Sequence, residues 1–210
     1  GEALRDFRYP DRVVIGTNNS KKISPILKKL YDPIIKKGAK FIVVSRKAAE
    51  LIKYAANAFL ATKITFINEI ANLCEKTGIN VDDIAEGIGS DQRIGSRFLR
   101  AGPAYGGSCF PKDTKALAKT SDDFKVNLSL IKNVIRSNGN RNNLIVQKIL
   151  KIAKQNNLKK IGFLGVTFKA NTDDMRDSSS LFIIPKLLKN NLKISYYEPT
   201  GNKSILSKYK

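Results

Sequence analysis

From Arg46 to Thr77 the sequence contains neither proline nor glycine, and its apolar side chains recur at helical spacing. This pattern predicts a single helix of about 30 residues, roughly 45 Å long at a rise of about 1.5 Å per residue. Gly78 follows as a natural C-terminal stop. In a chain of 210 residues a helix this long usually spans domains or forms a subunit interface, so it constrains the fold more than any other segment.

Shorter elements flank the long helix on both sides. Apolar runs, helical periodicity and turn residues predict strands at 12–16, 40–45, 160–166 and 192–197, and helices at 24–37, 81–87, 113–118, 128–155 and 180–189. The last strand, loop, helix and strand form a βαβ unit, the start of a parallel sheet. The sequence therefore predicts an α/β chain in three parts: the tail of one α/β domain (1–45), a helical middle (46–157) and the start of a second α/β domain (158–210).

The ends of the sequence predict an internal piece of a longer protein. The chain begins with Gly1, and Met175 is its only methionine. No window approaches the ~20 consecutive apolar residues of a membrane span, and no secretory signal opens the chain. We therefore expect a cytoplasmic protein that has no membrane partner.

The formal net charge of +20 makes nucleic acid the first partner to consider. However, the lysines are scattered as singles and pairs, and no run of five basic residues occurs. Solvated helix faces are the favoured interpretation, and an anionic small-molecule substrate would still gain from the positive field. The absence of histidine excludes a Ser-His-Asp triad, and two distant cysteines argue against a zinc or haem site, so no metal is expected.

Cys109 is the first candidate for chemistry. It ends a glycine-rich turn, where backbone amides can converge on an anion, and Lys112 and Asp113 follow within one helical turn. Positive charge and amide dipoles favour the nucleophilic thiolate, and Asp113 is placed to orient water or take a proton. The alternative is a buried structural cysteine, but this is poor core sequence. Cys74, within the long helix, is expected only to pack, without a disulfide.

Lys53 and Asn57 form a second candidate site. They are four residues apart on the long helix, so both project from one face. The neighbours of Asn57 from Tyr54 to Ala61 are all apolar or aromatic, where a lysine and an asparagine cost free energy unless polar groups meet them. A surface Lys–Glu pair with a solvated asparagine is the alternative. The apolar surroundings favour a polar site.

A third cluster, residues 168–180, lies between a predicted strand and a predicted helix. Open α/β sheets bind ligands at this position, and a helix N-terminus favours phosphate. Lys169 and Arg176 would add positive charge. Ser and Asp residues at a helix start are also ordinary caps, so both interpretations stay open.

Four motifs carry a family resemblance over essentially the whole chain. In chain order they are Lys53-Tyr-Ala-Ala-Asn-Ala-Phe-Leu-Ala61, Gly89-Ser-Asp-Gln-Arg-Ile-Gly95, Gly106-Gly-Ser-Cys-Phe-Pro-Lys-Asp113 and Phe168-Lys-Ala-Asn-Thr-Asp-Asp-Met-Arg176. Through them the chain resembles the UDP-glucose 6-dehydrogenase family of nucleotide-sugar dehydrogenases. The resemblance implies Rossmann-like domains on either side of a helical dimerisation domain, and a homodimer or larger homo-oligomer. It also implies oxidation of the C6 alcohol of UDP-glucose to a carboxylate, with two molecules of NAD and one water.

The resemblance also implies roles for individual residues. Cys109 matches the nucleophile that captures the aldehyde as a thiohemiacetal and then carries the acid as a thioester. Lys53 and Asn57 match the pair that stabilises the oxyanion and holds the water, and Asp113 the carboxylate that assists hydrolysis. The other matched positions are substrate contacts at Lys53, Phe98, Leu99, Arg100, Ala101, Gly102, Gly106 and Lys169, a substrate contact from a neighbouring subunit at Arg93, and positions near the NAD at Lys112 and Arg176.

The sequence departs from the family's pattern in one loop and at its ends. The family usually has Gly-Pro-Gly-Phe-Gly where this chain has Gly-Pro-Ala-Tyr-Gly; Ala104 narrows the backbone freedom and Tyr105 adds a hydroxyl. Residues 1–12 match the segment just after the family's catalytic glutamate, so Glu2 is not that glutamate. The Gly-x-Gly-x-x-Gly turn for NAD is missing as well. We therefore expect the 210-residue chain by itself to make no NADH.

Two alternative functions stay open. Within the same family, the activity could be GDP-mannose or UDP-N-acetylmannosamine dehydrogenation, although Phe110-Pro-Lys-Asp113 looks more like the UDP-glucose branch. From a different class, the chain could be a basic, non-catalytic nucleic-acid-binding module, which would show DNA affinity that falls steeply with salt.

Overall fold

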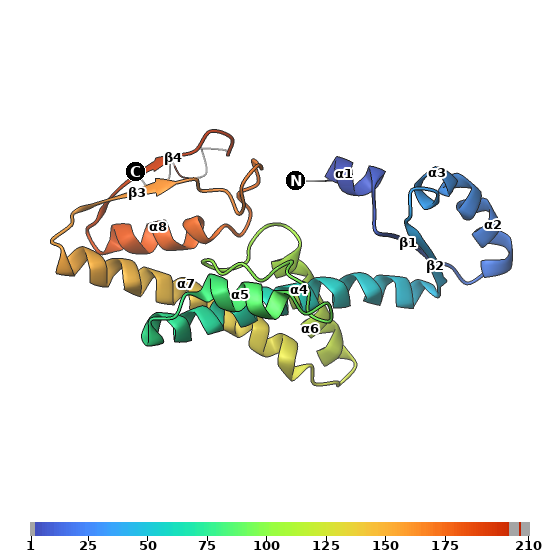
Figure 1. The fold of residues 1–210 in the computed structure, drawn as a ribbon, viewed down its shortest axis with the longest axis horizontal. Coiled ribbons are helices and arrows are strands. Elements are labelled where there is room, and N and C mark those ends of the chain that lie inside the picture. The colour runs from blue at the N-terminus through green and yellow to red at the C-terminus, as the bar shows by residue number, and fades with distance from the viewer. Residues whose placement is uncertain (1–2, 202–205, 207–210) are drawn as a thin grey trace. The chain divides into compact units, whose positions relative to one another are not determined.

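A computed structural model of the chain describes residues 3–201 and 206. It confirms an α/β fold (Figure 1), with the elements α1 (Ala3–Arg8), β1 (Arg12–Gly16), α2 (Ser20–Leu30), α3 (Asp32–Ile35), β2 (Lys40–Val44), α4 (Arg46–Thr77), α5 (Val81–Gly89), α6 (Phe110–Asp123), α7 (Ser129–Gln155), β3 (Lys160–Leu164), α8 (Ser179–Lys189) and β4 (Lys193–Tyr197). The chain divides into two compact units, Gly1–Ala56 and Asn57–Lys210. Within the described residues, no helix is both long enough and apolar enough to cross a membrane.

The first unit contains a parallel pair of strands. β1 and β2 pair along their whole length, with Arg12 opposite Lys40. Both strands confirm the sequence prediction, and β2 ends one residue earlier than expected, at Val44. α2 and α3 connect them, which makes this a βαβ-type crossover.

The single helix predicted at 24–37 is wrong in its start and in its continuity. α2 begins four residues earlier, because the side chain of Asn19 accepts a hydrogen bond from the backbone N–H of Lys22 at 3.2 Å and caps the helix. The helix is then interrupted at Tyr31 and resumes as α3. Pro33 accounts for the break, because it lacks the N–H that a continuous helix would need at this position, whereas proline suits the first turn of a new helix.

α4 confirms the predicted long helix at both ends. It runs from Arg46 to Thr77, and Gly78 follows with a φ of +73°, the left-handed conformation that commonly ends helices. Most of its buried residues recur every three or four positions, at Ala58, Ala61, Thr65, Ile67, Asn68, Ala71 and Cys74. The helical period read from the sequence therefore describes one packed face of this helix.

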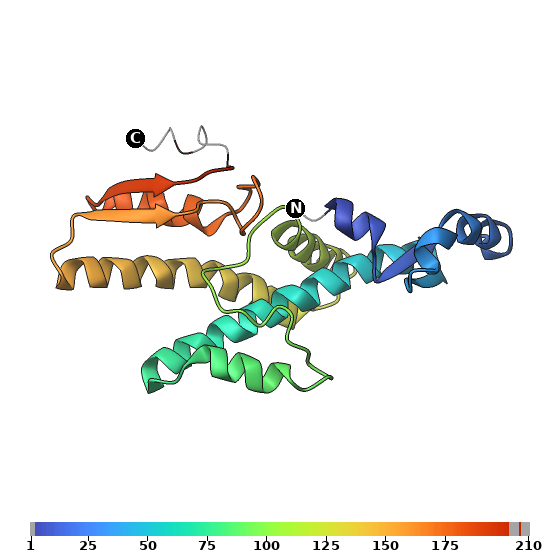
Figure 2. The same ribbon diagram turned by 45° about the horizontal axis from the view of Figure 1, so that its top comes forward.

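In the second unit α7 crosses the second half of α4, and the two helices diverge toward their C-terminal ends (Figure 2). Ser137 of α7 donates a hydrogen bond to Glu69 of α4, and further along Lys148 forms an ion pair with Glu75. The residue numbers in these two contacts increase along both helices, from 69 to 75 in α4 and from 137 to 148 in α7, so the two helices run in the same general direction. The loop after α5 follows α4 as well, because Nζ of Lys63 donates to two carbonyls of this loop at 2.9 Å each.

Three helices of the second unit are longer than predicted. α8 begins one residue earlier, at Ser179, and α5 ends at Gly89 rather than at residue 87. α6 covers Phe110–Asp123, whereas the sequence predicted 113–118. Pro111 does not delay its start, since the first turn of a helix has no need of that N–H. An ion pair of 2.6 Å between Lys119 and Asp123, one turn apart, supports its extended end.

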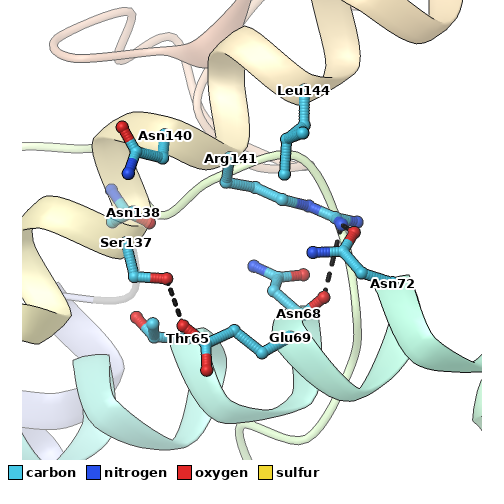
Figure 3. A pocket seen from close by; sticks show the side chains of 9 residues that line it. All are labelled: Thr65, Asn68, Glu69, Asn72, Ser137, Asn138, Asn140, Arg141 and Leu144. Carbon is cyan, nitrogen blue, oxygen red and sulfur yellow. Dashed lines mark hydrogen bonds between the residues drawn. The ribbon is translucent and has the colours of Figure 1, made fainter.

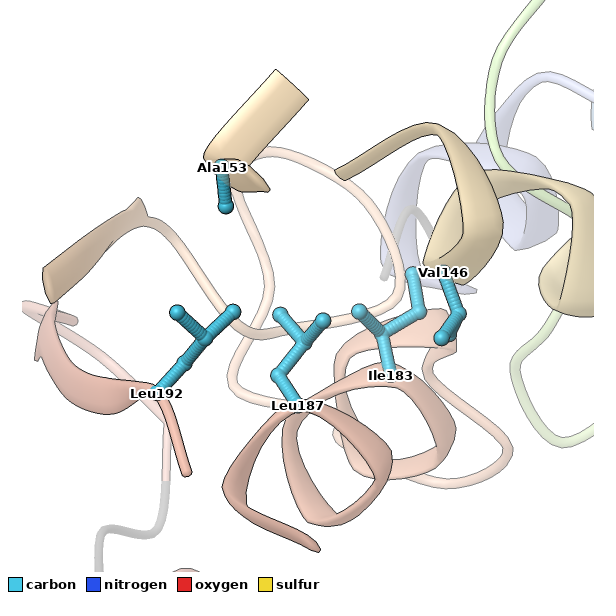
Figure 4. Packing of buried hydrophobic residues seen from close by; sticks show 5 residues of the cluster. All are labelled: Val146, Ala153, Ile183, Leu187 and Leu192. Carbon is cyan, nitrogen blue, oxygen red and sulfur yellow. The ribbon is translucent and has the colours of Figure 1, made fainter. Parts of the chain in front are cut away.

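The predicted βαβ unit at the C-terminal end is confirmed. β3 and β4 pair in parallel, with Lys160 opposite Lys193, and α8 connects them. β3 ends at Leu164, two residues earlier than predicted, and Gly165 turns the chain there with a φ of +82°; β4 begins one residue late. α8 packs against α7 through a core that Figure 4 shows, formed by Val146, Ala153, Ile183, Leu187 and Leu192. This packing fixes the start of α8 beside the central helices.

Candidate active site

Cys109 is exposed and stands at the N-cap of α6. Its carbonyl accepts the hydrogen bond from the N–H of Asp113 at 2.9 Å, and its Sγ lies 3.7 Å from the hydroxyl of Ser108. The N-terminus of a helix carries partial positive charge, which stabilises a nearby anion such as a thiolate. The alternative of a buried structural cysteine is therefore wrong for Cys109, whereas Cys74 is the packing residue that the sequence predicts, at 4% exposed.

Asn57 on α4 forms a hydrogen bond with Asp113, which lies on α6, the helix that begins directly after Cys109. Its Nδ2 donates to Oδ2 of Asp113 at 2.6 Å, although 56 positions separate the two in sequence. Oδ1 of Asp113 lies 2.9 Å from Nζ of Lys112. Asp113 is 0% exposed, so its charge relies on such partners. Lys53 lies one turn before Asn57 on α4, and its side chain is exposed.

A cavity of about 580 Å³ opens beside the cysteine, lined by Ser108, Cys109, Lys112, Arg176 and Asp177. Nε and Nη2 of Arg176 donate to the two carboxylate oxygens of Asp174 at 2.9 and 2.8 Å. This pairing raises the pKa of Arg176 and lowers the pKa of Asp174. The cavity therefore brings the candidate nucleophile together with both residues predicted to lie near the cofactor.

A second cavity, of about 280 Å³, contains most of the predicted substrate contacts. It is lined by Ile64, Asn68, Phe98, Arg100, Gly102, Pro103, Ala104, Tyr105, Gly106, Phe110, Phe168 and Lys169. Leu99 and Ala101 are not among the lining residues; Leu99 is only 3% exposed and packs near Gly89. Lys53 and Arg93, also predicted substrate contacts, line neither cavity. The side chain of Arg93 is 90% exposed and pairs with Asp91 at 2.6 Å.

Two glycines lie in close contact with the C-terminal βαβ unit. A Cβ added to Gly106 would lie 2.1 Å from the backbone oxygen of Asp177, and one added to Gly107 would lie 2.7 Å from the ring of Phe168. Gly107 has a φ of +81°, and its N–H donates to the carbonyl of Arg176 at 2.8 Å. The turn before the cysteine therefore requires glycine for close approach as well as for conformation.

Ala104 and Tyr105, the two departures from the family's loop, both fit into the structure. Ala104 lines the second cavity. The side chain of Tyr105 is 8% exposed and packs with Ala61 and Val134, and its ring meets Phe110 edge to face with centroids 6.0 Å apart. Burial raises the pKa of Tyr105, and a hydrogen bond with Thr114 opposes this rise. The added hydroxyl thus has a polar partner.

The sequence analysis missed a set of polar residues that hold the loop lining the second cavity. Asn68 on α4, Asn138 and Arg141 on α7, and Ser179 on α8 all bond the backbone of residues 102–105. Figure 3 shows the first three beside a polar pocket between α4 and α7. The signal was present in principle, because asparagine is a poor helix former and a buried arginine inside a helix needs partners.

Two family models match the chain. The central domain of the UDP-glucose/GDP-mannose dehydrogenase family matches residues 47–140, and the UDP binding domain of the same family matches residues 162–210. The UDP-glucose 6-dehydrogenase of Rickettsia felis is 48% identical over 202 residues, which is 96% of this chain and 45% of that protein. The chain spans about half the length of the curated relatives it matches.

Solved structures agree with these matches. The structure of a UDP-glucose dehydrogenase from the archaeon Pyrobaculum islandicum has a TM-score of 0.88 and 33% identity, covering 98% of this chain and 46% of that chain. The structure of a UDP-D-ManNAc dehydrogenase from Pyrococcus horikoshii has a TM-score of 0.81 and 25% identity, covering 96% of this chain and 47% of that chain.

Proposed function

Since this chain belongs to the UDP-glucose/GDP-mannose dehydrogenase family, we propose that it forms part of an NAD-dependent enzyme that oxidises UDP-glucose to UDP-glucuronate. Its UDP-glucose 6-dehydrogenase relatives, at 44–48% identity, support this substrate over other nucleotide sugars. The observation that carries the proposal is the 2.6 Å contact between Asn57 and Asp113, on the first turn of the helix that follows the exposed Cys109.

Cys109 supplies the nucleophile. Oxidation of the C6 alcohol removes a hydride and a proton and gives an aldehyde, to which the Cys109 sulfur adds as a thiohemiacetal. Loss of a second hydride, together with the proton of the thiohemiacetal hydroxyl, leaves a thioester. Water then attacks the thioester carbonyl, the carbon–sulfur bond breaks, and the carboxylate and the free thiol are released. One alcohol and one water thus yield one carboxylate, and two hydrides are removed.

Asn57, Asp113 and Lys53 act on the oxyanion and the water. The amide of Asn57 is held by Asp113, so it keeps a fixed direction as oxyanion charge develops. The buried carboxylate of Asp113 assists the attack of water by accepting its proton. Lys53 shares the helix face of Asn57 and adds positive charge for the oxyanion, in accordance with its match to the family motif.

The second cavity fits the nucleotide sugar. Arg100 and Lys169 supply cationic groups for the diphosphate, and Phe98 supplies an apolar surface. The family model for the UDP binding domain includes Lys169, which supports this assignment.

NAD fits the cavity beside Cys109. Lys112 and Arg176 are both exposed there, and although each pairs with a carboxylate, both would contribute positive charge beside a cofactor pyrophosphate. When bound, NAD accepts the hydrides that the reaction releases. The chain's own residues hold the cofactor and place the sulfur of Cys109 next to it.

We further propose a homodimer formed through α4. Phe59, Phe66 and Leu73 are seven residues apart and 65%, 48% and 61% exposed, so they form an apolar stripe along one face. A second copy of the chain would cover this stripe. The guanidinium of Arg93, which is exposed and paired with Asp91, would then reach the neighbouring subunit's substrate.

The domain division and the compartment are part of the same proposal. Residues 1–45 and 158–210 are parts of two Rossmann-like domains, and 46–157 is the central domain. The separate matches of the central domain to residues 47–140 and of the UDP binding domain to residues 162–210 support this division. Cys74 and Cys109 are free thiols, which suits a reducing compartment, and we propose the cytoplasm.

The test measures NADH formation by the full-length protein with UDP-glucose, UDP-N-acetylmannosamine and GDP-mannose in parallel. UDP-glucose is expected to give two NADH for each molecule consumed, at the highest kcat/KM of the three. Cys109→Ser should form no acid, because an un-ionised serine hydroxyl is a much weaker nucleophile than a cysteine thiolate. Faster turnover of another sugar would replace the proposed substrate, and acid formation by the serine variant at the wild-type rate would exclude Cys109 as the covalent residue.

A further inference from the structure

Residues 102–105, here called the substrate loop, have no regular secondary structure, yet side chains hold their backbone at almost every polar group. The N–H of Gly102 donates to Oδ1 of Asn68 at 2.8 Å, and Nε of Arg141 donates to the carbonyls of Gly102 and Pro103 at 3.0 and 3.1 Å. The hydroxyl of Ser179 lies within 3.3 Å of both backbone polar atoms of Ala104. Three helices therefore fix this loop.

Asn138 makes the most complete of these contacts. Its Oδ1 accepts from the N–H of Tyr105 at 2.9 Å, and its Nδ2 donates to the carbonyl of the same residue at 3.1 Å. One amide thus satisfies both backbone groups of one residue, as a neighbouring β-strand would. Asn138 lies on α7 beside Arg141, as Figure 3 shows, and it does not line the cavity of the substrate loop.

Tyr105 connects this contact to the reaction site. Its ring packs edge to face on Phe110, the residue directly after Cys109. The next residue along the chain, Gly106, lies against Asp177, where the structure leaves no room for a side chain. A shift of Tyr105 would therefore move the wall of the substrate cavity and the start of α6 together.

We propose that Asn138 is a positioning residue for substrate binding, which acts through the backbone of Tyr105 to hold the substrate loop in its binding conformation. The inference rests on the proposed function, because it takes the cavity lined by this loop as the site of the nucleotide sugar. Asn138 itself touches no reacting group in this account.

The amide chemistry of Asn138 separates this role from mere packing. Asp has the same shape as Asn, but it replaces the donor that faces the Tyr105 carbonyl with a second acceptor oxygen. At about the 3.1 Å of the present contact, two oxygens repel each other. If Asn138 only fills space, Asp should be tolerated and Ala should not. If it positions the loop, Asp should be at least as harmful as Ala.

The experiment uses the full-length protein with Asn138→Ala, Asn138→Asp and, as matched control, Asn140→Ala, an exposed residue two positions away on the same helix. Steady-state kinetics with UDP-glucose and calorimetric binding of UDP are measured for each. Asn138→Ala should raise KM and the dissociation constant of UDP by about tenfold, with kcat within about threefold of wild type. Asn138→Asp should show an equal or larger rise, and Asn140→Ala none.

Ser179→Ala provides a second route to the same result, since it removes the one hydroxyl oxygen of α8 that contacts both backbone polar atoms of Ala104. It should raise KM in the same direction even if the Asn138 variants fold poorly. Wild-type values for Asn138→Asp, or an unchanged UDP affinity in all variants, would overturn the inference. If the wild-type protein binds UDP but does not oxidise UDP-glucose, the proposed function fails, while the UDP affinities still decide the role of Asn138.

Discussion

At the scale of single residues, the two cysteines differ in a way that can be measured directly. Cys109 is exposed at a helix N-terminus, and Cys74 is 4% exposed inside the face of α4. Alkylation requires contact with the reagent, so Cys109 should react at least about tenfold faster with iodoacetamide at neutral pH. Peptide mapping at short reaction times measures both rates. Denatured protein is the control, in which the two should react alike, and faster labelling of Cys74 in the native protein would contradict the assignment.

Single residues also show where sequence reasoning reaches its limit. Cys109, Lys112 and Asp113 lie within one helical turn, so their proximity could be predicted from the sequence alone. The partner of Asn57 could not be, because its contact with Asp113 joins positions 56 residues apart. The same holds for Asn138, whose role exists only once α7 lies against the substrate loop. Local patterns identify which polar groups need partners, and only the packing decides which partners they have.

At the scale of elements, the end of β4 depends on one carboxylate. Oε2 of Glu198 accepts from the N–H of Val166 at 2.8 Å, and Oε1 accepts from the N–H groups of Thr200 and Gly201 at 2.9 and 3.1 Å. These backbone donors, Val166 first, lower the pKa of Glu198 from 4.5 to about 2. The carboxylate thus fixes the turn after β3 to the turn after β4.

The sign of the resulting pH dependence follows from this lowered pKa. The stabilisation is complete above the unfolded-state pKa of 4.5 and is lost as the pH falls toward about 2. Glu198→Gln should lower the free energy of unfolding at pH 7, and the difference from wild type should shrink between these two pH values. Denaturant unfolding at several pH values measures this. Glu86→Gln, at an exposed position of α5, is the control. If the difference in the free energy of unfolding between wild type and Glu198→Gln stayed constant with pH, it would contradict this account.

The exposed stripe on α4 predicts the oligomeric state. Phe66→Glu would place a charge in the centre of an apolar interface, so the proposed dimer should dissociate at least about tenfold more readily. Light scattering after size exclusion over a range of concentrations measures the change. Phe124→Glu, at a residue 76% exposed beyond the end of α6, should leave the dimer intact. A dimer of unchanged affinity in Phe66→Glu would place the interface elsewhere.

Among the elements, those with a strong local signal were predicted well. α4 was found to the residue, because its period is uninterrupted and Gly78 ends it. The helix at 24–37 failed because a cap at Asn19 and the missing N–H of Pro33 override the apolar pattern. The path of the loop between α5 and α6 along α4 depends on contacts such as those of Lys63, which no local pattern contains.

At the scale of the whole molecule, the net charge of +20 separates the proposed enzyme from a nucleic-acid-binding protein. Part of this charge is paired on the surface, as in the ion pairs Lys119–Asp123 and Lys132–Asp122. Scattered and partly paired lysines give only weak, non-specific DNA binding, with dissociation constants of roughly 10⁻⁴ to 10⁻⁶ M at physiological salt. The part of the positive charge that lies in the second cavity, on Arg100 and Lys169, should instead bind a nucleotide sugar.

The final prediction compares the two ligands in one titration series. Fluorescence anisotropy with a labelled 20-base-pair duplex is expected to show weak binding that weakens steeply between 50 and 200 mM salt. UDP-glucose affinity should change far less over the same range, because a cavity with few charged contacts and several apolar ones is screened less than an open surface. Tight duplex binding at 200 mM salt that UDP-glucose cannot displace would contradict the enzyme assignment.

The variant Lys169→Ala should distinguish the two ligands further. It should weaken UDP-glucose binding by about tenfold, because it removes a positive charge from the cavity. It should leave duplex affinity nearly unchanged, because it removes only one of the 38 basic residues of the chain.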